Sequence, residues 1–125
     1  MVRQMLAPNA GWSLVAQQHG NLVLADVVGF ASVAPVSASE VEVGLLVEDR
    51  HQRQGLGARL LYDVAMEAAA RGYQTIACIA QPDNHAVITT VHRAGLIGRV
   101  AWIDGLLHIS VPVRRLSLRS SSLAG

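Results

Sequence analysis

A glycine-containing loop, residues 52–57, joins an apolar run to an amphipathic helical pattern that begins at Ala58. Its sequence is Gln-Arg-Gln-Gly-Leu-Gly, and Gly55 and Gly57 lack a Cβ, so a ligand can approach the main chain closely. The loop amides and the unpaired N–H groups of the first helical turn would face that ligand at the positive end of the helix dipole. The loop therefore predicts a binding site for the oxygens of a phosphate-rich anion.

Positive side chains flank this loop, because Arg50, Arg53 and Arg59 lie within or beside it. A Walker loop requires Gly-Lys-Ser/Thr, and no lysine lies near these residues. The dinucleotide fingerprint Gly-x-Gly-x-x-Gly requires a glycine at position 60, which is Leu60. Both nucleotide motifs are excluded, and a tight strand-to-helix turn without a ligand is the remaining alternative to an anion site.

Length and composition favour one packed domain over residues 1–125, with residues 114–125 as a flexible tail. Hydrophobic residues make up 51% of the chain and charged residues 15%, which supplies a core and excludes wholesale disorder. The net charge is +1, no basic stripe is present, and aromatic residues make up only 4%. A nucleic-acid partner is therefore not expected.

Cys78 is the only cysteine, which excludes an internal disulfide and a cysteine-based metal site. It is more typical of a small buried hydrophobe than of a nucleophile, and we expect no metal. The first twenty residues lack a signal-type apolar segment, and no stretch approaches the roughly 20 apolar residues of a membrane span. We expect a cytoplasmic protein without membrane attachment.

A strand, a helix and a second strand follow one another around the loop. We expect strands over residues 12–18, within 22–33 and over 40–47, with a loop at 34–39. Apolar residues recur at helical spacing from Ala58 to Arg71, and Gly72 supplies a left-handed stop. Tyr73 to Ala80 then forms a mostly apolar strand, so strand, helix and strand make one crossover unit whose strands are parallel.

Five β-branched residues, Val87 to Val91, would by themselves favour a strand. Pro82-Asp83-Asn84 supplies turn and N-cap residues before them and Gly95 a stop after them, so we expect a helix. Residues 100–103 and 106–113 then form a hairpin through an Asp-Gly turn.

The order of these elements and motifs resembles the GNAT superfamily of acetyl-CoA-dependent N-acyltransferases, from about Trp12 to Val113. The Gln-x-x-Gly-x-Gly loop matches its pyrophosphate motif, and three further segments match its third strand, its fourth strand and its Asn-helix-Gly segment: Val28–Ala31, Leu45–Asp49 and Asn84–Leu96. The resemblance implies an α/β (α+β) fold. It has a mixed central sheet, a β-α-β acyl-CoA-binding core and a second, Asn-initiated helix.

The resemblance also implies how acetyl-CoA binds. In the family the fourth and fifth strands, here 40–47 and 73–80, splay apart, and the pantetheine arm pairs with the fourth strand. Asn84 would line the cofactor side of its helix, although it can equally be a plain N-cap that binds nothing. The implied cofactor-binding residues are Leu46, Val47, Gln52, Arg53, Gln54, Gly55, Leu56, Gly57, Ala58 and Asn84.

Catalysis in the family requires a base that deprotonates the amine, often a Glu on the fourth strand. The resemblance points to Glu42, with Glu40 second, and the alternative is that both merely face solvent on an alternating strand. Family members often carry a Tyr that protonates the leaving thiolate, and that position is Val91. Either His92 or water replaces it, or the chain uses no acid.

A second departure lies at the N-terminus, since Met1 to Gly11 is too short for the family's first strand and two helices. The chain is expected to begin at the family's second strand. Its acceptor pocket would be incomplete, completed by a second subunit, or completed by a domain outside this sequence, and exposed sheet edges favour a homodimer.

Two functions follow from the resemblance. The first is an N-acetyltransferase that moves an acetyl group from acetyl-CoA to a primary amine of a small molecule or protein. The alternative is a non-catalytic acyl-CoA-binding sensor or regulatory domain. A fragment of a larger acetyltransferase is also compatible with the sequence, which does not identify the acceptor.

Overall fold

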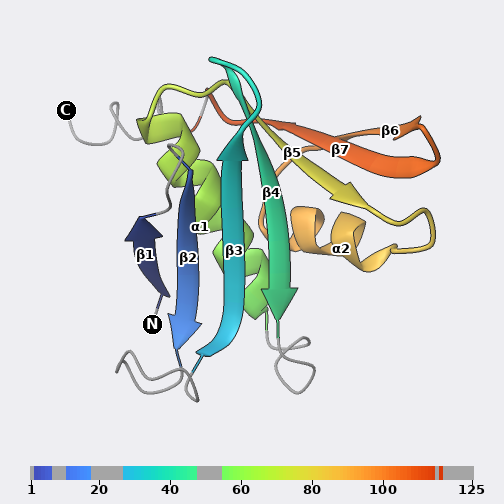
Figure 1. Ribbon diagram of the computed structural model, residues 1–125. Coiled ribbons are helices and arrows are strands. Elements are labelled where there is room, and N and C mark those ends of the chain that lie inside the picture. The colour runs from blue at the N-terminus through green and yellow to red at the C-terminus, as the bar shows by residue number, and fades with distance from the viewer. Residues whose placement is uncertain (1, 7–10, 18–26, 48–54, 115, 117–125) are drawn as a thin grey trace.

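The computed structural model describes residues 2–6, 11–17, 27–47, 55–114 and 116. Within these ranges the chain forms one seven-stranded sheet and two helices (Figure 1). The elements, in chain order, are β1 (Val2–Leu6), β2 (Trp12–Gln17), β3 (Val27–Pro35), β4 (Glu40–Val47), α1 (Leu56–Ala70), β5 (Thr75–Ala80), α2 (Ala86–Arg93), β6 (Arg99–Ile103) and β7 (Leu106–Pro112).

The sheet has the strand order β1-β2-β3-β4-β5-β7-β6. Strands β1 to β4 form an antiparallel meander, β5 is parallel to β4, and β7 pairs antiparallel with both β5 and β6. Helix α1 connects the two parallel strands. The expected mixed sheet with one β-α-β crossover is therefore confirmed.

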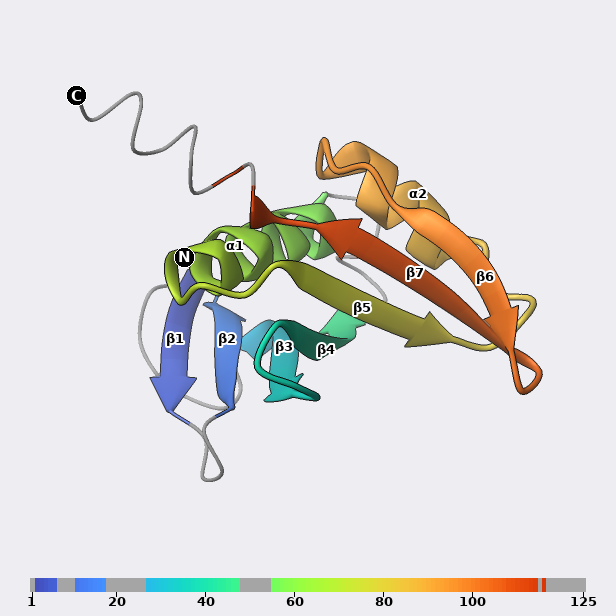
Figure 2. The ribbon, with the colours of Figure 1, turned by 90° about the horizontal axis from the view of Figure 1, so that it is seen from above.

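Both helices cover the same face of the sheet (Figure 2). On β4, Val41 and Val43 are buried under them while Glu42 is exposed, which is the alternation that a sheet with one covered face requires. Leu60, Leu61 and Val64 of α1 are fully buried in the same core. The described residues leave the opposite face of the sheet uncovered.

Each helix ends in the same way, at a glycine with positive φ. After α1, Gly72 (φ 90°) donates its N–H to the Ala69 carbonyl and Tyr73 donates to Ala68. After α2, Gly95 (φ 75°) and Leu96 make the equivalent bonds to carbonyls three and five residues earlier. Both ends are Schellman motifs, so the two predicted glycine stops are confirmed.

Helix α1 begins at Leu56, earlier than expected, because Gly55 takes a left-handed conformation (φ 77°) that turns the chain directly into the helix. The Arg59 N–H donates to the Gly55 carbonyl at 3.0 Å and closes the first turn. Part of the predicted anion loop is therefore the helix's own first turn.

Three sequence expectations are corrected. Strand β1 pairs with β2 across residues 2–6, so the described chain does not begin at the family's second strand. Strand β3 continues to Pro35, because its ladder with β4 extends to Pro35↔Val41 and shortens the expected loop. Neither change alters the order of the other strands.

The third correction concerns the start of α2. His85 occupies the N-cap position without a side-chain hydrogen bond to the helix, and Asn84 lies in the preceding turn, where its N–H donates to the Gln81 carbonyl. The N-cap prediction for Asn84 is therefore wrong.

The β6–β7 hairpin is confirmed. Asp104 (φ 51°) and Gly105 (φ 77°) both have positive φ, as a type I′ turn requires. Of the expected tail, residues 115 and 117–125 lie outside the described residues, while Leu116 is partly buried against the core.

Candidate functional site

Strands β4 and β5 pair at one end and separate at the other. Their ladder runs from Glu40↔Thr75 to Val43↔Cys78, yet β4 continues to Val47 and β5 to Ala80 (Figure 1). Beyond Val43, β4 pairs only with β3, and the end of β5 pairs only with β7. Two strand edges therefore face each other with backbone groups that no described strand satisfies.

A cleft of about 900 Å³ occupies this opening. Its walls come from β4, the first turn of α1, β5, the turn after β5, α2 and the start of β7. The lining residues are Val43, Gly44, Leu45, Gly57, Cys78, Ile79, Ala80, Gln81, Asn84, Ala86, Val87, Thr89, Thr90, Arg93 and Leu106.

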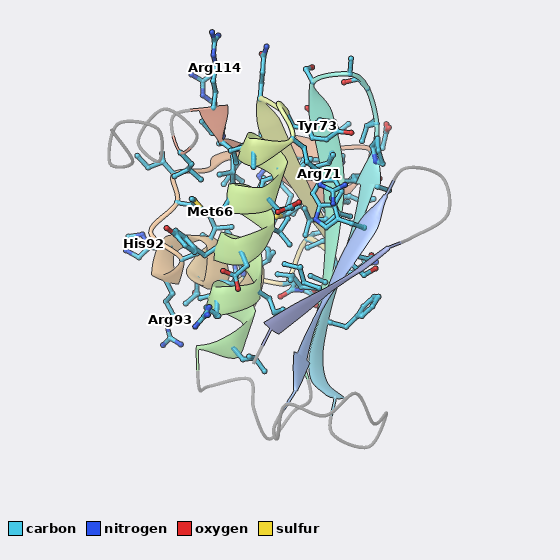
Figure 3. All side chains as sticks on the ribbon, turned by 90° about the vertical axis from the view of Figure 1, so that its left-hand side faces the viewer. Met66, Arg71, Tyr73, His92, Arg93 and Arg114 are labelled. Atoms are coloured by element: carbon cyan, nitrogen blue, oxygen red, sulfur yellow. The ribbon has the colours of Figure 1, made fainter. Side chains whose placement is uncertain are left out.

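Helix α2 has one stripe of residues that faces the cleft and another that faces the core. The stripe that faces the cleft contains, at helical spacing, Ala86, Thr89, Thr90 and Arg93. The Thr90 hydroxyl donates a hydrogen bond to the Ala86 carbonyl at 2.8 Å. Arg93 projects from the last turn of α2, toward the end of the molecule where α1 begins (Figure 3). The cleft therefore has mostly small and apolar strand walls and a polar helical wall with a cation at its end.

The start of α1 forms one end of the cleft. Its first turn contains no acidic residue, and Gly57 lines the cleft directly. A Cβ added to Gly55 would meet no heavy atom of the described residues within 4 Å, so these residues leave the space beside the turn open. First-turn N–H groups, the positive helix end and open space are the features that an anion needs.

The expected cation Arg59 has a partner within its own helix, because its Nε donates to Asp63 Oδ2 at 3.2 Å. It is therefore less available to an anion than the loop sequence suggested. Arg50 and Arg53 lie outside the described residues.

The expected cofactor-binding residues fall into three groups. Gly57 and Asn84 line the cleft, and Gly55, Leu56 and Ala58 adjoin Gly57. The backbones of Leu46 and Val47 pair with Phe30 and Gly29 on the part of β4 that has left β5. The remaining three, Gln52, Arg53 and Gln54, lie outside the described residues.

The two candidate bases lie on the uncovered face of the sheet. Glu42 is exposed and belongs to a row of directly paired residues that crosses four strands: Glu42, Ala77, Ser110 and Arg99. Glu40 is half-buried at the start of β4. Neither lines the cleft, but Glu42 directly precedes Val43, whose side chain does.

The residues considered as acids differ in their surroundings. Val91 is buried, and a Cβ added to Gly98 would lie 3.4 Å from its Cγ1, so it belongs to the core-facing stripe of α2. His92 is exposed on the outer side of α2 and does not line the cleft (Figure 3). Neither residue reaches the space between the strands.

Cys78 lines the cleft but remains only 2% exposed. Burial raises the pKa of its thiol to about 11, so the thiol is protonated at neutral pH. It acts as a small apolar part of the wall, and it is poorly suited to nucleophilic chemistry.

Sequence reasoning missed Cys78, Thr89, Thr90 and Arg93 as cleft residues. The polar stripe of α2 was a usable signal, because a helix with one apolar and one small polar face lines something other than the core.

Within the described ranges, no group of three or more His, Cys, Asp or Glu side chains could hold a metal ion. No helix found there has the length and apolar character needed to cross a membrane.

The site is thus a mixed sheet that opens between two parallel strands, with a helix N-terminus at the end of the opening. The model of the acetyltransferase (GNAT) family matches residues 3–96, which is more than half of the chain. The chain belongs to this family.

Solved structures share the fold. The GNAT domain of S. lividans PAT superposes with a TM-score of 0.68 at 25% identity, over 83% of this chain and 61% of that one. The protein yncA of Salmonella typhimurium, solved with its cofactor acetyl-CoA, gives a TM-score of 0.62 at 24% identity, over 82% and 63%. A cAMP-binding acyltransferase from Mycobacterium smegmatis gives a TM-score of 0.66 at 21% identity, over 84% of this chain and 32% of that one.

This chain therefore spans less than two thirds of the length of each of these three proteins. None of the curated proteins matches it.

Proposed function

We propose that the chain is an N-acetyltransferase that binds acetyl-CoA between β4 and β5 and transfers the acetyl group to a primary amine of a small molecule or protein. The observation that carries this proposal is the opening beyond Val43↔Cys78, which leads along an unsatisfied strand edge to the N-terminus of α1. The acetyl-CoA in the yncA structure supports the same donor.

The pantetheine arm of the donor suits the free edge of β4. Its two amides can pair with backbone groups near Leu46 and Val47 as an added strand would. The pyrophosphate then meets the N–H groups from Gln52 to Ala58, and Arg93 offers a cation on the opposite wall. Asn84 lines the cleft and would contact the donor there. The cleft volume of about 900 Å³ lies within the usual range for ligand sites.

The acceptor amine approaches from the uncovered face, where Glu42 removes the proton of the ammonium. The amine nitrogen forms a bond to the thioester carbon, and the carbon–sulfur bond then breaks. Water relays the second proton of that nitrogen to the leaving thiolate, which leaves a neutral amide and a thiol, because neither Val91 nor His92 lines the cleft. Glu40 is the second candidate for the base.

The buried position of Val91 favours one alternative, a non-catalytic acyl-CoA-binding sensor or regulatory domain. Such a domain would keep the cleft and lack turnover. For either function we propose that residues 1–125 act as one domain in the cytoplasm and pair as a homodimer. The single cysteine agrees with a reducing compartment.

Calorimetry with acetyl-CoA tests the binding step. Arg93→Gln should weaken binding by roughly 3- to 10-fold, with a smaller salt dependence than the parent, because it removes a charge from the cleft wall. Arg59→Gln is the matched control, since it removes the same charge from an arginine that is paired with Asp63. Equal effects of the two changes would contradict the role of Arg93.

Transfer is tested with acetyl-CoA and a broad panel of amines, with release of free thiol as the signal. Turnover with any amine supports the enzyme. Tight acetyl-CoA binding without turnover across the panel supports the sensor, and absence of binding contradicts both functions.

A further inference from the structure

The cleft reaches the uncovered face of the sheet at Gly44 and Ile79. The alternation that exposes Glu42 puts the next β4 position of that face at Gly44, and the equivalent position on β5 is Ile79. Both residues line the cleft together with Val43 and Cys78, which face the helices. The cleft therefore extends through the sheet, and an acceptor on the uncovered face can reach a thioester there.

The row of paired residues beside this opening has opposite charges at its two ends. Its members, from β4 to β6, are Glu42, Ala77, Ser110 and Arg99. Directly paired residues share a face, so all four lie on the uncovered face. Glu42 and Arg99 are exposed, and within the described ranges neither forms an ion pair. A negative and a positive group are therefore available to one ligand.

The middle of the row is low, and its β7 side is polar. Ala77 has the smallest side chain of the four and is only 5% exposed, so its neighbours rise above it. Ser110 adds a hydroxyl next to Arg99, and His108, two residues away on the same face of β7, adds a half-buried imidazole. A hydroxyl, an imidazole and a guanidinium can all donate hydrogen bonds to a carboxylate. This end of the row therefore suits an anionic group.

The length of the row limits what can lie across it. Strands are about 4.8 Å apart, so three spacings separate the Cα atoms of Glu42 and Arg99 by about 14 Å. Even with both side chains upright, hydrogen bonds of about 3 Å at each end leave at most about 8 Å between an amine nitrogen and a carboxylate. An amine and a carboxylate joined by a short aliphatic chain fit this limit.

We propose that the acceptor is an amine that also carries a carboxylate, with the amine at Glu42 and the carboxylate bound by Arg99 and Ser110. The proposal rests on the proposed acetyl transfer and names the class of its acceptor. Arg99 is then a specificity residue, because it contacts the part of the acceptor that does not react. A free amino acid with a terminal amine and a lysine beside an acidic residue of a peptide both have this chemistry.

Matched amines test the proposal through thiol release from acetyl-CoA. 4-Aminobutanoate should have a kcat/KM about tenfold or more above that of 4-aminobutanamide, which has the same amine and no carboxylate. A blocked Lys-Glu dipeptide compared with Lys-Gln measures the same preference for a peptide source, and the larger preference identifies the source. Equal values within both pairs, or higher values for the uncharged members, overturn the proposal.

Arg99→Gln should lower kcat/KM for 4-aminobutanoate about tenfold and change that for 4-aminobutanamide less than about twofold, because only the carboxylate loses a partner. Arg99→Glu should reverse the preference, so that 1,4-diaminobutane becomes the better acceptor. Arg114→Gln is the matched control, because Arg114 is also exposed and follows Pro112, which pairs with Thr75 at the end of β5 away from the opening. Equal losses for both amines in Arg99→Gln overturn the assignment of Arg99.

Calorimetry on the chain loaded with CoA separates this proposal from the proposed function. 4-Aminobutanoate should bind about tenfold more tightly than 4-aminobutanamide, and Arg99→Gln should remove the difference. If acetyl-CoA binds and no amine is acetylated, the proposed transfer fails, and this titration still decides whether the row binds an amine with a carboxylate. If an uncharged amine is acetylated and the titration shows no difference, the transfer stands and the proposed acceptor class is overturned.

Discussion

Glu42 and Val43 are neighbours on β4 whose side chains point to opposite faces of the sheet. Val43 lines the cleft on the side of the helices, while Glu42 is exposed on the uncovered side. Since β4 leaves β5 directly after Val43, a thioester in the opening could be reached from the side of Glu42. The proposed donor and acceptor therefore occupy opposite faces and meet where the sheet opens.

Glu42→Gln should lower kcat/KM by about 10²- to 10⁴-fold, because the amide cannot accept the proton of the ammonium, while acetyl-CoA binding stays the same. The measurement is thiol release with an amine that the parent acetylates. Glu40→Gln is the control on the same strand and face, and it should retain most of the activity. Turnover that Glu42→Gln leaves unchanged would show that Glu42 is not the base.

Cys78 should make the free energy of unfolding depend on pH. Burial raises its pKa from the ordinary 9.0 to about 11, so the unfolded chain loses the proton first as the pH rises. The stability linked to the thiol is fully present below pH 9 and is lost as the pH approaches 11, by about 2–3 kcal/mol. Urea titrations at both pH values should show this loss in the parent and not in Cys78→Ala. Equal losses in the two proteins would contradict the assignment.

At the scale of elements, α1 and α2 build the cleft with different parts. Helix α1 contributes its N-terminus, and α2 contributes one side along its length. Each is held by an apolar stripe on the core and by a glycine-stopped C-terminus. Core packing and defined helix ends therefore hold both walls in place.

Gly55→Ala should weaken acetyl-CoA binding tenfold or more, because Gly55 has φ 77° and the alanine must either strain this turn or move the first-turn amides. Gly72→Ala is the matched control, with φ 90° and similarly open surroundings at the other end of α1. Both changes should lower the melting temperature, and only Gly55→Ala should change the calorimetric affinity. Parallel losses of affinity would mean that stability, not the anion site, is responsible.

The sequence predicts elements best where a local pattern decides them. Helical spacing identified α1, alternation identified Glu40–Val47, and Asp104-Gly105 identified the hairpin. Strand β1 has no such pattern and exists through its pairing with β2. The polar stripe of α2 could have indicated Arg93, whereas no motif marks Cys78, which lines the cleft only because β5 and α2 both face the opening.

At the scale of the whole molecule, the opening divides the sheet into two parts. Strands β1 to β4 form one, and β5, β7 and β6 form the other, and only four residue pairs of the β4–β5 ladder join them within the sheet. Helix α1 packs on β2, β3 and β4 and also contacts β5 and α2. A ligand in the cleft would touch both parts and act as a bridge between them.

Acetyl-CoA should therefore stabilise the chain and protect both walls together. At 100 times its dissociation constant it adds about 2.7 kcal/mol, which corresponds to a rise in melting temperature of roughly 10 °C for a domain of this size. Hydrogen exchange should slow at β4 beyond Val43, in the first turn of α1 and along α2, because ligand contacts or burial restrict opening at each. The β6–β7 turn, which has Asp104 at its tip, is the internal reference and should exchange at the same rate with and without ligand. Protection of only one wall would mean that acetyl-CoA lies on the surface of one part and does not occupy the opening.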